Sequence, residues 1–191
     1  MVEFASINPN YSSKSVVQTI CIAFKNQQIV QLQDFITQNA YKLMINQINS
    51  AHWKEMYEPD KFKCDFAQVP LPILKFFFSQ KFRNLMQQLT RTTLKKNPMC
   101  VLTRFSKGQY TLLHDQPEHT NSIWFGFELT PTWNTSWGGF SSIVSKEKEL
   151  CRISPIKNSL TIFQLSKQTS MFVKYVNHSA KNKRVFISGI F

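Results

Sequence analysis

Two stretches in the second half of the chain decide its fold. Residues 110–140 read YTLLHDQPEHTNSIWFGFELTPTWNTSWGGF, and residues 158–191 read NSLTIFQLSKQTSMFVKYVNHSAKNKRVFISGIF. Both alternate apolar and polar residues and are interrupted by Pro, Asn and Gly, a pattern typical of short antiparallel strands joined by turns. Several such strands in succession predict a double-sheet jelly roll, with a mouth where inward side chains converge on a small ligand.

The first half of the chain is predicted to be mainly helical. Apolar residues recur every three or four positions over residues 28–48 and again over residues 71–94, where Phe78 belongs to the apolar stripe. Residues 16–24 can form a strand, and the polar stretch 51–66 is expected to be a loop because Pro and Asp interrupt it. The two helices would bury their stripes against a sheet.

We therefore predict one α+β domain over residues 1–191. Residues 1–97 form a mainly helical support region with two helices, and residues 98–191 form the core, a double-stranded β-helix or jelly roll. No apolar run approaches the ~18 residues of a membrane span. The N-terminus lacks the basic and apolar segments of a secretory signal. We thus expect an intracellular, cytoplasmic protein with no membrane partner.

The four cysteines are expected to be buried free thiols. Cys21, Cys64, Cys100 and Cys151 lie far apart, without the CxxC spacing of many metal and redox sites. We prefer this interpretation to a metal or disulfide role, because free Cys behaves as a small apolar residue.

The charge of the chain is uneven. Its formal net charge is +12, and the excess lies in two basic blocks, residues 61–107 and residues 145–191, on either side of an acidic middle. Such blocks favour polyanionic surfaces, here an acidic protein, a ribosome or nucleic acid. The alternative is a basic solvated surface that only aids solubility, since no compact nucleic-acid-binding motif accompanies the charge.

The second half resembles the iron- and 2-oxoglutarate-dependent oxygenases, particularly the prolyl-hydroxylase branch that includes hydroxylases of ribosomal proteins. The landmarks are the strand that ends in His114, the FELTPTW segment at 127–133, the WGG at 137–139 and the closing RVFISGIF at 184–191. The resemblance covers roughly residues 98–191 and implies a jelly-roll fold. For an active member it also implies Fe(II) and 2-oxoglutarate as cofactors.

The resemblance also shows where the metal site has changed. Family members take two iron ligands from His-x-Asp at the end of a strand, where residues i and i+2 point the same way. This chain has His114-Asp115-Gln116, so a neutral amide stands at the second ligand position and Asp115 is one residue out of phase. In the family, the distal His precedes an Arg in the sequence. Counting back from Arg184 places this His position at Met171 or Phe172, and neither side chain is suited to bind iron.

The remaining histidines are expected to be structural or exposed. His178 lies in an Asn-His-Ser turn, where we expect a surface or capping residue, although it is a weak candidate for a metal ligand together with His114. His119 sits in a predicted loop, and His52 precedes a Trp in the first half. We expect neither of these two to bind a metal.

The cosubstrate position has one retained and one altered residue. Arg184 matches the Arg that holds the distal carboxylate of 2-oxoglutarate in the family. Glu128 stands where the family has a Tyr that shares this carboxylate. We hypothesise that Glu128 and Arg184 form an internal ion pair in the cosubstrate pocket. The alternative is that Glu128 points outward and Arg184 faces solvent. Trp133 and Trp137 are candidates to line the old substrate groove.

These changes favour an oxygenase-like protein with degraded iron and cosubstrate sites, acting as a non-catalytic binding protein without a cofactor. One alternative is an active Fe(II) dioxygenase with rearranged ligands, namely His114, Asp115 and His178, that hydroxylates a protein side chain. Another is a basic module associated with nucleic acid or the ribosome.

Overall fold

The computed structural model describes residues 6–94, 96–113, 122–146 and 148–191. The helices are α1 (Lys14–Gln27), α2 (Gln38–Asn49), α3 (Leu71–Phe77) and α4 (Gln80–Thr90), with short 3-10 helices at Pro9–Ser12 and Thr135–Trp137. The strands are β1 (Ile29–Leu32), β2 (Lys54–Glu58), β3 (Phe62–Ala67), β4 (Met99–Phe105), β5 (Tyr110–Thr111), β6 (Ile123–Glu128), β7 (Ser141–Ser145), β8 (Lys148–Ile153), β9 (Leu160–Gln164), β10 (Thr169–Val173) and β11 (Arg184–Ile190).

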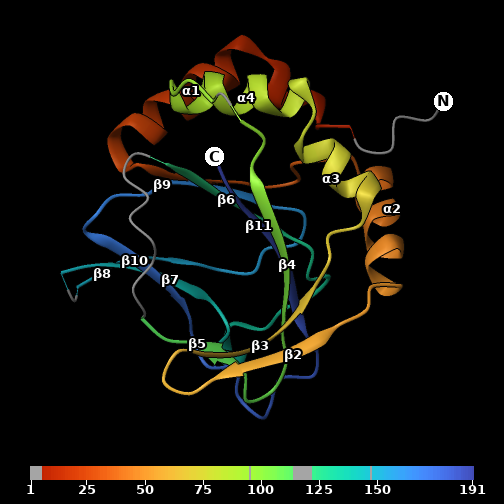
Figure 1. Cartoon of the computed structure of the whole chain (residues 1–191). Helices are drawn as coiled ribbons and strands as arrows, with labels where there is room; N and C mark the ends of the chain where they lie inside the picture. The colour runs from red at the N-terminus through yellow and green to blue at the C-terminus, as the bar shows by residue number, and fades with distance from the viewer. Residues whose placement is uncertain (1–5, 95, 114–121, 147) are drawn as a thin grey trace.

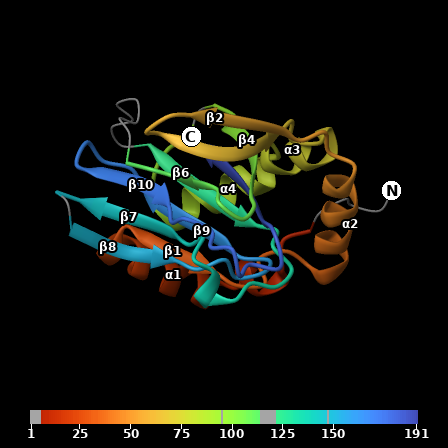
Figure 2. The same cartoon turned by 90° about the horizontal axis from the view of Figure 1, so that it is seen from below.

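The strands form two antiparallel sheets. The main sheet has the order β1-β9-β6-β11-β4-β3-β2, with β5 paired to β3, and the smaller sheet has the order β10-β7-β8. Figures 1 and 2 show the smaller sheet beside the main sheet, as in a jelly roll. The predicted α+β class with a double-stranded β-helix is therefore confirmed, and the main sheet also recruits strands from the first half of the chain.

The helices cover one face of the main sheet (Figure 1). Their apolar faces meet the sheet in the largest hydrophobic cluster, which contains several aromatic rings. Phe77 of α3 stacks on Phe125 of β6 with ring centroids 5.1 Å apart, and Phe82 of α4 meets Phe125 edge-on at 5.2 Å. The prediction that the apolar stripe is buried holds for Phe82, which is fully buried.

The opposite face of the main sheet looks toward the smaller sheet. Two smaller apolar clusters fill this space, one around Phe105 and Phe186 and the other around Trp124 and Ile143. In β6 and β11 successive residues alternate between the helix side and this inter-sheet side. The inter-sheet space also contains buried polar residues, which form the site described below.

The sequence-based prediction for residues 16–48 was partly wrong. Residues 16–24 lie in α1, because Cys21 and Phe24 bury one side of a helix and the apolar run fits either periodicity. The predicted helix over 28–48 begins only at Gln38, since β1 precedes it. Thr37 caps α2 by accepting a hydrogen bond from the backbone N–H of Ala40.

Two further predictions in the first half need correction. The expected loop at 51–66 contains most of the β2–β3 hairpin. The expected single helix over 71–94 is two helices, because Ser79 interrupts it and caps α4 through the N–H of Phe82. Phe78 was expected on the buried stripe. Because of this break, it is instead 36% exposed to solvent. The described residues thus hold four α-helices rather than two, and none is long and apolar enough to cross a membrane.

All four cysteines are free thiols, as predicted. Cys21 and Cys64 are buried, whereas Cys100 and Cys151 are only partly buried. Burial raises the pKa of Cys64 and of Cys100 to about 12. Both therefore remain neutral, weakly reactive thiols at physiological pH.

The correction to the apolar stripe can be tested with two neighbouring substitutions. Phe77→Ala empties a fully buried site among aromatic rings, so it should lower the free energy of unfolding by about 3–5 kcal/mol. Phe78→Ala removes a side chain that is 36% exposed and should cost about 1 kcal/mol or less. Urea denaturation monitored by fluorescence measures both, and equal losses would contradict the helix break at Ser79.

Candidate functional site

The site begins with the register of two neighbouring strands. Glu128, the last residue of β6, pairs with Phe186 of β11. Arg184 stands two residues before Phe186, so both side chains of β11 lie on the same face of the sheet as Glu128. Arg184 reaches Ser141 at the start of β7 in the smaller sheet. The two charged residues therefore point into the space between the sheets.

Glu128 and Arg184 form a buried ion pair. Arg184 Nε donates a hydrogen bond to Glu128 Oε2 at 3.1 Å, and Arg184 Nη2 lies 3.0 Å from the same oxygen. The two side chains are only 3% and 5% exposed. The alternative in which Glu128 points outward is thus not what the structure shows.

The remaining polar atoms of the pair also have partners. Arg184 Nη1 donates to the carbonyl of Gly139 at 2.7 Å and to the Ser141 hydroxyl at 3.0 Å. The hydroxyl of Thr130 donates to Glu128 Oε1 and accepts from the backbone N–H of Val185. Each charge is therefore surrounded by hydrogen bonds, which is the condition for burying an ion pair without a large penalty.

The WGG segment places one of these partners. Gly138 has φ +71° and Gly139 has φ +66°, values that favour glycine. A Cβ atom on Gly138 would lie 2.2 Å from the carbonyl oxygen of Tyr175, so the turn requires glycine there. In this conformation the Gly139 carbonyl faces Arg184. The WGG landmark thus contributes to the ion-pair site through its backbone.

The two predicted groove tryptophans hold this turn. Trp133 Nε1 donates to the carbonyl of Gly138 at 2.9 Å, and its ring meets Trp137 edge-on with centroids 5.3 Å apart. Both rings are partly buried and pack against the inter-sheet cluster that contains Phe186. Their contacts therefore stabilise the WGG turn, while a role in a substrate groove stays a prediction.

The predicted metal positions lie mostly outside the described residues. This applies to His114, Asp115 and Gln116. Met171 is partly buried in β10 and packs against the cluster around Trp124 and Ile143. Among the residues that the structure describes, there is no group of three His, Cys, Asp or Glu side chains that could hold a metal ion.

The two histidines among the described residues, His52 and His178, lie at the surface. His178 is exposed, and its Nε2 lies 2.9 Å from the Tyr175 hydroxyl. His52 is also exposed, in the segment between α2 and β2, and His119 lies outside the described residues. Phe172, the other candidate for the distal position, lines a shallow cleft between β5 and β10. These places give no support to a ligand role for His178.

Sequence reasoning missed several parts of the site. Thr130 follows Glu128 by two residues within the FELTPTW segment. This spacing could have identified it as a partner on the same side of the strand. Ser141 and the Gly139 carbonyl could not be identified without the path of the turn. Tyr41 of α2 was also missed, and its hydroxyl donates to the carbonyl of Leu129 at 2.8 Å. Burial raises the pKa of Tyr41, and the nearby Glu128 carboxylate raises it further.

Comparisons with known proteins agree with this architecture. The family described as "Oxoglutarate and iron-dependent oxygenase degradation C-term" matches residues 54–191. Prolyl 3-hydroxylase OGFOD1 of Mus musculus is 34% identical over 97 residues, which is 48% of this chain and 18% of that protein. The Xenopus laevis protein is 32% identical over 98 residues, 46% of this chain and 19% of that protein. Each match spans less than a fifth of the relative's own length.

Solved structures show the same fold. A Pseudomonas putida prolyl-4-hydroxylase superposes with a TM-score of 0.71 at 10% identity, covering 92% of this chain and 97% of that one. A Trichoplax adhaerens prolyl hydroxylase, in complex with a hypoxia inducible factor peptide fragment, has a TM-score of 0.68 at 13% identity and covers 95% of both chains. With the family match over residues 54–191, the chain belongs to the 2-oxoglutarate- and iron-dependent oxygenase superfamily, in its prolyl-hydroxylase-like branch.

Proposed function

We propose that this chain is a non-catalytic oxygenase-like domain that has kept its jelly roll for binding rather than for oxidation. The observation that carries the proposal is the buried Glu128–Arg184 ion pair. It occupies the place where, by resemblance, family members bind the distal carboxylate of 2-oxoglutarate. The domain thus supplies its own carboxylate to the cosubstrate arginine.

The residues at this site do not fit 2-oxoglutarate. The Arg184 guanidinium already makes hydrogen bonds or ion-pair contacts to Glu128, the Gly139 carbonyl and Ser141. An incoming dicarboxylate would have to displace Glu128 and would meet its negative charge in a poorly solvated space. Two carboxylates that compete for the same guanidinium repel each other strongly where water is excluded. The site therefore disfavours the cosubstrate electrostatically and sterically.

The surroundings of Met171 support the same conclusion for iron. Resemblance places the distal His of the family at Met171 or Phe172, and Met171 packs against Trp124 and Ile143. A thioether in an apolar cluster is a poor ligand for Fe(II), which prefers imidazole and carboxylate. The alternative of an active dioxygenase would have to find its ligands elsewhere, with His114, Asp115 and His178 as the candidates.

The ion pair should make a large contribution to stability. Glu128→Ala leaves the Arg184 cation buried without its partner, so the free energy of unfolding should fall by about 3–5 kcal/mol. Glu58→Ala is the control, because it removes half of an exposed pair with Lys61 and should cost about 0–1 kcal/mol. Urea denaturation measures both losses.

A double substitution separates charge from packing in this test. Glu128→Leu combined with Arg184→Met leaves no charge behind, so it should recover most of the stability lost by Glu128→Ala. If Glu128→Ala folds too poorly, Glu128→Gln provides a milder variant that keeps the side-chain length. Single variants no less stable than Glu58→Ala would contradict the role of the pair.

Adding 2-oxoglutarate tests the proposal directly. The melting temperature of the wild-type protein should not change, because Glu128 already occupies the cosubstrate position. That of Glu128→Ala should rise, since a free carboxylate can then pair with Arg184. Binding to the folded state at 100 times Kd adds about 2.7 kcal/mol of stability. The Glu128→Leu/Arg184→Met variant is the matched control and should show no rise.

An assay of catalytic turnover distinguishes the proposal from the alternative of an active dioxygenase. Wild-type protein supplied with Fe(II), ascorbate and 2-oxoglutarate should release no succinate above the level of heat-treated protein. Stoichiometric Fe(II) binding that is lost in His114→Ala, together with succinate release, would establish the active dioxygenase and refute the proposal.

A further inference from the structure

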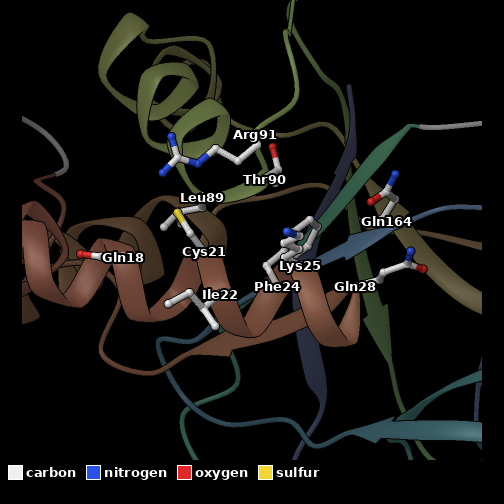
Figure 3. A pocket seen from close by; sticks show the side chains of 10 residues that line it. All are labelled: Gln18, Cys21, Ile22, Phe24, Lys25, Gln28, Leu89, Thr90, Arg91 and Gln164. Atoms are coloured by element: carbon white, nitrogen blue, oxygen red, sulfur yellow. The ribbon is translucent and has the colours of Figure 1, made fainter.

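A cleft on the helix layer lies away from the ion pair. It has a volume of about 540 Å³ and opens between α1 and the end of α4, on the helix side of the main sheet. Its apolar lining includes Cys21, Phe24 and Leu89. Figure 3 shows two cationic side chains around it, Lys25 from α1 and Arg91 at the end of α4.

The rim of the cleft carries groups that can form hydrogen bonds. Gln18, Gln28 and Gln164 contribute amides, each of which can both donate and accept. Figure 3 shows Gln28 and Gln164 close to each other at one side of the cleft. Cys21 and Thr90 are not available in this way, since each donates to a backbone carbonyl of α4. The amides and the two cations thus define the polar chemistry of the cleft.

The helices around the cleft contain basic residues and no acidic ones. Within α1, α3, α4 and the capping residue Arg91 there are six basic side chains and no Asp or Glu: Lys14, Lys25, Lys75, Lys81, Arg83 and Arg91. α1 and α4 both end at the cleft, and each helix C-terminus carries roughly half a negative charge. Two half charges offset only one of the two cations Lys25 and Arg91. The cleft therefore remains net positive and attracts anions.

The composition of the face distinguishes among anionic partners. Interfaces with proteins usually have an apolar and aromatic centre. On α1 and α4, which form the cleft, Ile22 is the only large apolar residue described as exposed, at 55%; Leu71 and Phe78 are exposed at α3, outside the lining of the cleft. The other exposed positions are cations, amides and hydroxyls. Interfaces with nucleic acid are more polar and more positive than those with proteins. The face matches the second kind.

The cleft itself favours a single strand. An apolar floor accommodates the face of a base, and amides at the rim can bond to the base edge. Lys25 and Arg91 stand where the flanking phosphates would lie. A base can enter such a cleft only when it is unstacked, which is easy in a single strand and costly in a duplex.

From this arrangement we infer that the α1–α4 cleft binds single-stranded nucleic acid, with one base in the cleft and the adjacent phosphates paired with Lys25 and Arg91. This site is separate from the Glu128–Arg184 pair. Its test therefore does not depend on whether the domain is catalytic, and failure of one proposal leaves the other standing.

Fluorescence anisotropy with labelled single-stranded RNA of about 20 nucleotides tests the inference, since this length exceeds the site of about 4–16 nucleotides that one small domain covers. The logarithm of the binding constant should fall linearly with the logarithm of the salt concentration between about 50 and about 200 mM. In the variant Lys25→Gln/Arg91→Gln, binding should weaken, and the slope should become shallower by about 1.4, because two phosphate contacts are lost at about 0.7 each.

The matched control removes two charges elsewhere. Lys181 and Lys183 are exposed in the turn before β11, and Lys181→Gln/Lys183→Gln gives the same net charge as the test variant. It should retain the wild-type slope. Equal loss in the two double variants would overturn the inference, because binding would then follow net charge alone.

A second readout locates the base without any mutation. In spectra of isotope-labelled isoleucine methyl groups, the Ile22 signal should shift on addition of the RNA, whereas that of Ile153 in β8 should not. Unchanged Ile22, or equal competition by polyglutamate or by phosphatidylserine vesicles at matched charge, would show a general anion surface and overturn the site.

Discussion

The buried contact between Glu128 and Arg184 is the constraint on which the middle of this domain depends. It joins β6 to β11 within the main sheet, and through Gly139 and Ser141 it joins β11 to the start of the smaller sheet. An ion pair in this position is stable only when its geometry and hydrogen bonds are complete. That requirement explains the paired glycines of the WGG turn and the hydroxyl of Thr130. Under the proposal above, a position that would otherwise hold the cosubstrate has become part of the fold.

The two faces of the main sheet consequently have different chemistry. The inter-sheet face holds a closed, neutralised site, in which each charge meets its opposite within the chain. On the helix side, α1, α3, α4 and Arg91 together carry six basic residues and no acidic one, and the cleft between α1 and α4 is open to solvent. This contrast is the basis of our proposal that the domain binds its partners on the helix side. Six of the 23 Lys and Arg residues of the sequence thus lie on this side of the sheet.

The overall fold could be predicted more accurately than the individual helices and strands. The alternating strands of the second half predicted the jelly roll, and the resemblance of FELTPTW and the final strand to the oxygenase family placed Glu128 and Arg184 at one site. Local patterns failed in the first half because VVQTICIAF fits a strand or a buried helix equally well, and tertiary contact with α4 decided for the helix. Ser79 was read as an interior residue of a helix, although it caps a new one. The partners Gly139 and Ser141 could not be predicted, since only the chain path brings them to the pair. The same holds for Tyr41, whose hydroxyl donates to the carbonyl of the neighbouring Leu129.

The central claim is that Arg184 is already occupied, and its own side chain can report this. In a ¹⁵N-labelled protein, the Nε–H signal of Arg184, assigned with an Arg184→Lys variant, can be followed during a titration with 2-oxoglutarate. The account predicts that the signal keeps its position throughout the titration, because Glu128 holds the guanidinium. A saturable shift of this signal in the wild-type protein would show that the cosubstrate displaces Glu128, and would contradict the account.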